Sequence, residues 1–214
     1  MSSQRIPLVA GECYHIFNRT QNKEPIFVRK SDSRRAIASL DYYRFADPPV
    51  KLSYFLSYGT DKRSRIIEKL NQSGRIVEVL AFCLMPNHFH LLVRQLKDGG
   101  ISRYLSLFQN SFAKYRNTKY QREGHLFGGQ FKVVKIEDDD QFLHVHRYIH
   151  LNPYTSLVVR NFDELENYSY SSLSEYLGIE EGFCHKEEVL AHFKNLTMYR
   201  NLFLVRPIIR KSLI

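Results

Sequence analysis

Hydrophobic residues follow two different periods along this 214-residue chain. Branched and aromatic residues are concentrated in segments typical of β-strands, at 12–19, 75–84, 88–93 and 131–136. Apolar positions spaced by three or four residues predict amphipathic helices at 31–45, 101–115 and 138–152. The order β-α-β-β-α-β predicts an α+β protein, with a ferredoxin-like split βαβ antiparallel sheet that carries helices on one face. One further helix follows this core.

Turn and capping signals bound several of these elements. Met85-Pro-Asn87 separates the second and third strands and predicts a tight hairpin. Asp138-Asp-Asp140 predicts the start of the last helix, because carboxylates there cap free N–H groups; capping is preferred here over a metal cluster. Pro153 disfavours continuation, so this helix is expected to end at about Asn152. Residues 51–72 fit either a helix or a loop, and the pattern leaves that choice open.

His88 and His90 are separated by one apolar residue in the third predicted strand. Successive side chains of a strand point to opposite faces, so both imidazoles lie on one face and Phe89 points into a core. Two imidazoles on one rigid element offer a metal ion two ligands and require a third from elsewhere. Taken alone, such a pair is more often surface or hydrogen-bonded histidine than a ligand pair.

Tyr148 and Asn152 lie one turn apart on the same face of the last predicted helix. They border the apolar stripe Phe142, Val145 and Ile149, so the stripe can pack on the sheet while Tyr148 lies at its margin. A phenolate can attack a phosphodiester and hold it as a phosphotyrosine. An ion held by two imidazoles and one amide oxygen would stabilise the developing charge, and this ligand set favours Mg²⁺ or Mn²⁺ over structural zinc.

The charge balance adds a class of partner. The chain has 31 Lys and Arg against 22 Asp and Glu, a formal charge of +9, and a pI near 9.4, which favours a polyanion, nucleic acid before membrane. No long apolar span or lipidation signal suggests a membrane partner. Three scattered cysteines without CxxC spacing, and an N-terminus without an apolar signal segment, predict a cytoplasmic location.

These motifs together resemble a known family. His88-Phe-His90 after Met85-Pro-Asn, with Tyr148-Ile-His-Leu-Asn-Pro153 about sixty residues later, is similar to the two signatures of the single-tyrosine HUH transposases, specifically the REP-associated tyrosine transposase branch. Three further segments match in order: Tyr14-His-Ile-Phe-Asn-Arg19, Gly124-His-Leu-Phe with Phe131-Lys, and Tyr168-Ser-Tyr-Ser-Ser. The resemblance covers about 12 to 177.

The resemblance implies a nuclease, usually dimeric, that cuts single-stranded DNA near hairpins through a 5′-phosphotyrosine and rejoins the strands. By position, Tyr148 matches the nucleophile, His88 and His90 the metal-binding pair, and Asn152 the third metal-ligand position. The expected partners are single-stranded or hairpin DNA and a second copy of the chain. We expect the transposase domain at 1–155 and a C-terminal helical extension, with a candidate DNA-binding role, at 156–214.

Basic and aromatic side chains that follow one another near the central helix predict a single-strand groove with stacking aromatics. The predicted DNA-binding residues are Arg103, Lys114, Tyr115, Arg116, Lys119, Arg122 and Lys132. A solvated basic face is the competing interpretation. Tyr115 and Tyr120 are rival nucleophiles, but neither is followed by an amide one turn later.

Two other functions remain open at this point. A catalytically silent protein could use the same fold to hold hairpin DNA, and a metal-dependent hydrolase could use water while Tyr148 is incidental. His144, His146 and His150 lie on the same predicted helix as Tyr148. They are expected to be structural or to face DNA, and His144, one turn before Tyr148, could assist proton transfer.

Overall fold

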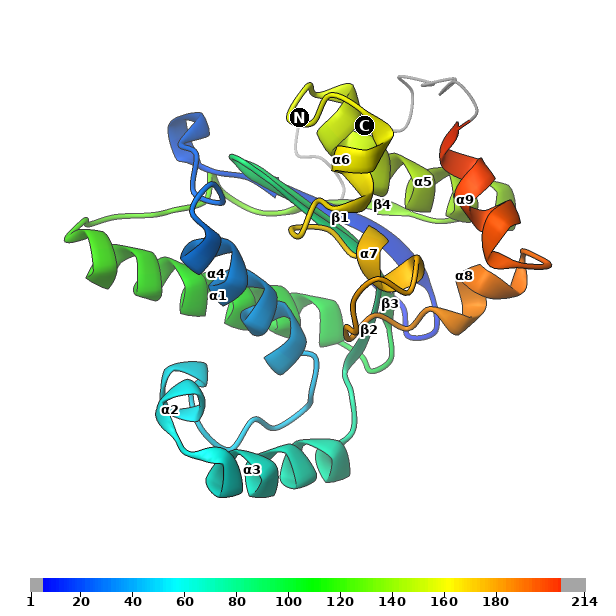
Figure 1. The fold of residues 1–214 in the computed structure, drawn as a ribbon. Coiled ribbons are helices and arrows are strands. Elements are labelled where there is room, and N and C mark those ends of the chain that lie inside the picture. The colour runs from blue at the N-terminus through cyan, green and yellow to red at the C-terminus, as the bar shows by residue number, and fades with distance from the viewer. Residues whose placement is uncertain (1–5, 205–214) are drawn as a thin grey trace.

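A computed structural model describes residues 6–204 of the chain. Its centre is a four-stranded antiparallel sheet in the order β2-β3-β1-β4 (Figure 1). The strands are β1 (Cys13–Arg19), β2 (Val77–Met85), β3 (His88–Gln95) and β4 (Lys132–Lys135). Because β3 lies between β1 and β2 and β4 joins the far side of β1, this is the predicted ferredoxin-like split βαβ arrangement. The predicted hairpin is also confirmed, since Met85 pairs with His88.

Helices cover both faces of the sheet. Helices α1 (Lys30–Tyr42) and α4 (Gly100–Tyr120) lie together on one face, where Phe89 of β3 packs edge-on against Phe108 of α4 with ring centroids 5.3 Å apart. Helix α5 (Asp139–Thr155) covers the opposite face, where His90 contacts Tyr148 (Figure 1). The alternation of side chains along β3 therefore divides one strand between an apolar core and a histidine-bearing surface.

The predicted start of α5 is confirmed, and its predicted end is wrong. The side chain of Asp138 accepts a hydrogen bond from the Gln141 N–H at 2.7 Å, as an N-cap does. The helix continues through Pro153 to Thr155 instead of ending at Asn152. A proline so close to the end removes one hydrogen bond only, and the Asn152 carbonyl still accepts from the N–H of Ser156 at 3.0 Å.

The segment 51–72, which the sequence pattern left undecided between helix and loop, is mostly helical. Helices α2 (Leu52–Ser57) and α3 (Thr60–Ser73) lie beside one another at the bottom of Figure 1, apart from the sheet. Leu52, Ile66 and Leu70 are buried. These three apolar side chains fasten the two helices to the rest of the molecule.

The chain beyond α5 returns across β2. It contains α6 (Phe162–Glu166), α7 (Leu173–Tyr176), α8 (Glu187–Ala191) and α9 (Leu196–Leu204). Near the other end of the chain, the short 3-10 helix η1 (Gln21–Lys23) follows β1. Ser171 bridges Cys83 of β2, and the hydroxyl of Ser172 accepts from the Phe82 N–H at 2.9 Å. The domain boundary at 155 stays a prediction. Residues 1–5 and 205–214, which include the end of the predicted C-terminal extension, lie outside the described residues. No helix within 6–204 combines the length and apolar character that a membrane span requires.

Candidate active site

Three of the four residues predicted for the chemistry meet on the face of the sheet under α5. The ring centroids of His88 and His90 are 5.1 Å apart, and those of His90 and Tyr148 are 5.5 Å apart. Strand β1 runs beside this pair, with Phe17 opposite His90 and Arg19 opposite His88. A strand and a helix that are about sixty residues apart in the chain therefore bring two imidazoles and a phenol together.

A chain of hydrogen bonds defines how His88 carries its proton. The Nδ2 of Asn87 donates to the carbonyl oxygen of Lys23 at 3.2 Å, which orients the amide so that its Oδ1 faces His88. This Oδ1 lies 2.8 Å from Nδ1 of His88 and can only accept. Nδ1 of His88 therefore carries the proton, and Nε2 keeps its lone pair for a ligand.

His90 has a partner that was not predicted from the sequence. Nε2 of His15, in β1, lies 3.0 Å from Nδ1 of His90, and both side chains are buried. The ring of His15 also meets the ring of Tyr148 edge-on, with centroids 5.8 Å apart. One signal in the sequence could have identified it: His15, Phe17 and Arg19 alternate along β1 and so share one face.

Both histidines of the pair are held neutral at physiological pH. Burial lowers the pKa of His88 to about 4, and the nearby charge of Arg19 contributes in the same direction. Burial also lowers the pKa of His90 well below its usual value, with further contributions from His15, His88 and Arg19. Only a neutral imidazole can bind a metal ion, so these shifts suit both rings to that role.

Tyr148 and Asn152 are linked to each other on α5. The Nδ2 of Asn152 donates to the backbone carbonyl of Tyr148 at 2.8 Å. Burial raises the pKa of the half-buried Tyr148 phenol, while a hydrogen bond with the Asn152 side chain and the charge of Arg19 act in the opposite direction. The phenol is therefore protonated at rest and must lose its proton when it reacts.

The residues of this face could hold a divalent ion. Two neutral imidazoles lie on one rigid strand, and the Asn152 amide lies beside Tyr148. Within 6–204, no group of three or more His, Cys, Asp or Glu side chains is arranged to hold a metal ion. The third ligand predicted from the sequence is the amide oxygen of Asn152, and that role stays a prediction.

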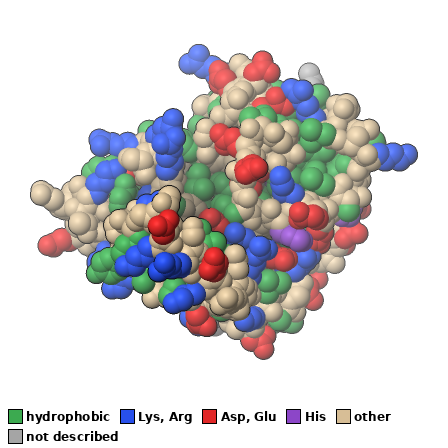
Figure 2. Space-filling view, turned by 60° about the horizontal axis from the view of Figure 1, so that its bottom comes forward, with side chains coloured by type: hydrophobic (Ala, Val, Ile, Leu, Met, Phe, Trp, Pro, Cys, Tyr) green, Lys and Arg blue, Asp and Glu red, His purple; other side chains and the backbone are tan. Residues whose placement is uncertain are grey.

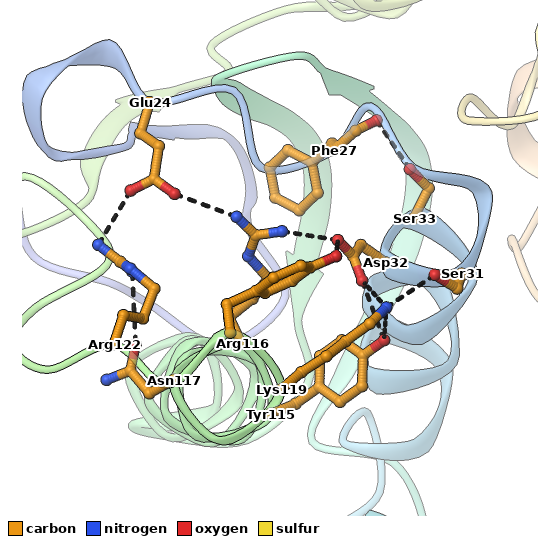
Figure 3. Close-up of polar contacts among 11 residues, drawn as sticks. Glu24, Phe27, Ser31, Asp32, Ser33, Tyr115, Arg116, Asn117, Lys119 and Arg122 are labelled. Atoms are coloured by element: carbon orange, nitrogen blue, oxygen red, sulfur yellow. Dashed lines mark hydrogen bonds and ion pairs between the residues drawn. The ribbon is translucent and has the colours of Figure 1, made fainter.

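Most of the predicted DNA-binding residues on α4 are engaged within the protein (Figure 3). The carboxylate of Asp32, from α1, lies among them and has no exposed area. Arg116 and Lys119 each donate to it at 2.6 Å, and the phenol of Tyr115 donates at 2.9 Å. The side chain of Arg116 is only 8% exposed. These three side chains thus have a structural role that accounts for their position.

The other predicted DNA-binding residues divide into paired and unpaired cations. Arg103 forms an exposed ion pair with Asp47 at 3.1 Å, and Arg122 pairs with Glu24 at 2.9 Å. Lys114 and Lys132 are exposed and form no ion pair with the described residues. Lys132 lies on the site's side of the molecule, since its Nζ is 5.8 Å from the centre of the Phe17 ring. The sheet separates the α4 residues from Tyr148.

Two further histidines of α5, His146 and His150, lie away from Tyr148. His146 and His150 have no exposed area and pack against Tyr176 and α9. Nε2 of His150 is 2.7 Å from the hydroxyl oxygen of Ser172. Both rings therefore contribute to the attachment of the C-terminal helices and not to the face that carries His90, as the structural interpretation of these histidines predicted.

Comparisons with known proteins agree with this geometry. Residues 51–152 match the family model described as "Transposase IS200 like". Among solved structures, a REP-associated tyrosine transposase bound to a REP hairpin is similar, with a TM-score of 0.56 and 15% identity over 83% of this chain and 86% of that one. A putative transposase from Deinococcus radiodurans aligns at a TM-score of 0.36 and 17% identity, over 70% of this chain and 95% of that one. No curated protein matches the sequence.

The residues that match the family model include the strand and the helix that carry the predicted site residues. The matched residues begin at α2 and end within α5, so they include the β2-β3 hairpin and the helix that covers it. Similarity to the REP-associated structure extends the shared fold over most of the chain. His88, His90, Tyr148 and Asn152 all lie among the residues that match this family model.

Proposed function

We propose that this protein cuts and rejoins single-stranded DNA through a covalent bond between Tyr148 and a 5′-phosphate. One observation carries the proposal: the phenol of Tyr148 lies beside the neutral imidazole of His90, with ring centroids 5.5 Å apart, on the face that also carries His88. Among the described tyrosines, neither rival fits as well. Tyr115 and Tyr120 both donate to Asp32 on the opposite side of the sheet.

The reaction is a transesterification. Oη of Tyr148 bonds to phosphorus as the bond from phosphorus to the 3′ oxygen breaks, so the strand ends as a free 3′-hydroxyl and a 5′-phosphotyrosine. The phenolic proton passes to water, and the departing 3′ oxygen takes up a proton. Attack by a 3′-hydroxyl on the phosphotyrosine then rejoins a strand and returns the phenol, so no ATP is required.

His88, His90 and Asn152 are the residues that would hold Mg²⁺ or Mn²⁺. Such an ion, when bound, polarises the phosphoryl oxygens and stabilises the charge that develops on them. The protein supports this by keeping both imidazoles uncharged and by directing Nδ1 of His88 into a hydrogen bond with Asn87. Asn152, the proposed third ligand, lies one helical turn from Tyr148, and its side-chain N–H donates to the backbone carbonyl of Tyr148.

Two cations border the proposed site and suit a nucleic-acid backbone. Arg19 is exposed on β1 next to His88, and its charge already lowers the pKa of His88 and opposes the rise at Tyr148. Lys132 is exposed on the neighbouring strand β4. Arg19 was not predicted from the sequence. We assign these two side chains to phosphates on either side of the scissile bond.

The substrate we propose is single-stranded DNA that adjoins a hairpin. Support comes from the similar fold of a REP-associated tyrosine transposase bound to a REP hairpin. The formal charge of +9 suits such a partner. A homodimer is part of the same proposal and rests on the resemblance to the family, as does the division of the chain at 155.

The test is formation of a covalent adduct. Purified protein is incubated with end-labelled hairpin DNA carrying single-stranded flanks, with Mg²⁺ or Mn²⁺ or with chelator, and the products are separated on a denaturing gel. We expect a slowly migrating protein–DNA band that requires metal and disappears in Tyr148→Phe. The matched control is Tyr154→Phe, because Tyr154 lies on the same helix and is 42% exposed; this variant should keep the band.

Other products would replace this proposal with a different function. Strand scission by Tyr148→Phe, with free 5′-phosphate ends and no adduct, would establish a hydrolase that uses water. Hairpin binding that is equal with metal and with chelator, without scission across a broad pool of hairpins, would establish a DNA-binding protein without catalysis.

A further inference from the structure

The two histidines of the proposed metal pair each use the same ring nitrogen in a hydrogen bond. Nδ1 of His88 contacts Oδ1 of Asn87 at 2.8 Å, and Nδ1 of His90 contacts Nε2 of His15 at 3.0 Å. In both rings this leaves Nε2 as the nitrogen that can bind an ion. The partners come from different places, a turn residue for His88 and the neighbouring strand for His90.

The two hydrogen bonds differ in how firmly their direction is determined. An amide oxygen can only accept, so the bond from His88 has one direction. An imidazole nitrogen can donate or accept, so the bond between His15 and His90 has two. If His15 donates, the proton of neutral His90 must be on Nε2, and His90 cannot bind metal. If His15 accepts, the proton of His90 is on Nδ1 and Nε2 carries a lone pair.

We propose that His15 is a positioning residue that accepts the Nδ1–H of His90, and so holds His90 in the tautomer that presents Nε2 to the ion. This inference rests on the proposed function, since it concerns the same site. Residues behind a metal-binding histidine orient the ring and raise its basicity, and their loss typically weakens metal affinity about 10–100-fold. His15 would take the place of the carboxylate or carbonyl that more often fills this role.

The surroundings of His15 suit this role better than that of a ligand or a base. Its Nε2 is already used by His90. A neutral ring that accepts at Nε2 carries its proton on Nδ1, which is buried without a hydrogen-bond partner among the described residues, so this tautomer costs some folding free energy. Its ring is held by Phe17 and by the edge contact with Tyr148, at centroid distances of 5.1 and 5.8 Å. The side chain has no access to substrate and acts through the ring beside it.

The first measurement needs no metal. A two-bond ¹H–¹⁵N correlation spectrum of the metal-free protein reports which nitrogen of each neutral imidazole carries the proton. We expect both His88 and His90 to carry it on Nδ1, and we expect His90 to lose this preference in His15→Leu. A proton on Nε2 of His90 in the wild-type protein would overturn the inference.

The second measurement is Mn²⁺ affinity, from the loss of the free-ion EPR signal on titration. We expect His15→Leu to bind Mn²⁺ about 10–100-fold more weakly than the wild type. His15→Gln should stay within about threefold, because its side-chain oxygen can accept where Nε2 of His15 did. The control is His125→Leu, since His125 is exposed and distant from the pair. Equal affinity of the wild type and His15→Leu would refute the role, as would equal losses in His15→Leu and His15→Gln.

Failure of this inference and failure of the proposed function give different results. If Tyr148→Phe still forms the adduct, the nucleophile is wrong, while the tautomer of His90 still decides the role of His15. If the adduct forms as proposed but the proton of His90 is on Nε2, the function stands and the positioning role does not. Should His15→Leu fail to fold, the wild-type spectrum and His15→Gln still decide the question.

Discussion

Two polar clusters on opposite sides of the sheet differ in charge. Around Asp32, Arg116, Lys119, Tyr115 and Tyr120 all donate to one buried carboxylate. Figure 3 shows the first three of these side chains around it. Burial alone would raise the pKa of Asp32, but these hydrogen bonds outweigh it and lower the pKa to about 2. This cluster is charged, and it joins α1 to α4.

The cluster around His90, which consists of His15, His88 and His90, is neutral. His15, His88 and His90 are all uncharged at pH 7, because burial lowers each pKa. Each ring of the proposed metal pair forms one hydrogen bond through Nδ1. The two clusters therefore differ in charge: a buried carboxylate with its cations joins two helices on one face, while neutral imidazoles lie together on the other.

The largest effect is expected from a substitution in the cluster around His90. His90→Gln should lower the rate of adduct formation by about 10³-fold or more, because a catalytic metal contributes several kcal/mol to the transition state. The measurement is the initial rate of the protein–DNA band at saturating DNA. The matched change in the other cluster, Lys119→Gln, should leave the rate per folded molecule within a few-fold. Similar losses in both variants would abolish the distinction between the two clusters.

The next largest effect is a loss of stability, and it is expected from a substitution in the cluster around Asp32. Asp32→Ala leaves Arg116 as a buried cation without its main partner, so the free energy of unfolding should fall by about 3–5 kcal/mol. Chemical denaturation measures this change. The control is Asp41→Ala on the same helix, whose ion pair with Arg44 is 48% exposed at the carboxylate and should contribute less than about 1 kcal/mol. If the two variants lose equal stability, the buried cluster has no special structural role.

Acid should act on the histidines before it acts on Asp32. Burial lowers the pKa of His15 to about 4 and of His150 to about 3, below the value of 6.5 expected in the unfolded chain. Between these values the unfolded state binds more protons, so stability falls as pH falls below 6.5, by roughly 1.4 kcal/mol per pH unit for each such histidine. Asp32 loses its contribution only below its normal pKa of 3.8, as pH approaches about 2.

This pH dependence can be assigned with one substitution. His150→Gln should reduce the slope of unfolding free energy against pH by about one proton between pH 6.5 and 4, while its amide can keep a hydrogen bond to Ser172. An unchanged slope in His150→Gln would show that this ring titrates alike in the folded and unfolded chain.

The smallest effect concerns the two kinds of lysine on α4. Lys114 is exposed without an ion pair, whereas Lys119 is bound to Asp32, whose hydrogen bond raises the pKa of the lysine. Lys and Arg side chains are frequent on the left half of the face in Figure 2, which brings the bottom of Figure 1 forward. If Lys114 contacts DNA, Lys114→Ala should weaken binding a few-fold and reduce the salt slope by about 0.7. Lys119→Ala should change the slope less, and the reverse order would reassign the contact.

Local patterns were enough to predict most of the fold. The alternation of apolar residues identified the strands, and Met85-Pro-Asn87 identified the hairpin that pairs Met85 with His88. The acidic start of α5 was predicted because capping depends on the residues next to the helix. Its end was not, because Pro153 acts against continuation locally while the chain beyond it still closes the last turn.

Local patterns also predicted part of the candidate site. His88 with His90, and Tyr148 with Asn152, are pairs within single elements, so the period of a strand or helix places them on one face. Arg116 and Lys119 were interpreted from their own helix as a DNA surface, because Asp32 is 84 residues away from Arg116 in the chain. A distant carboxylate that neutralises a basic helix leaves no trace in the pattern of that helix.

The sequence by itself determined the four strands, the split βαβ order and the two pairs of residues that carry the proposed chemistry, because each depends on a pattern within one element or on the order of the elements. Only the tertiary structure decided that His15 supports His90, that Arg19 lies beside His88, and that Asp32 occupies the basic side chains of α4. These three facts depend on pairing between elements far apart in the chain. Strand register and helix packing set such contacts, and no local period encodes them.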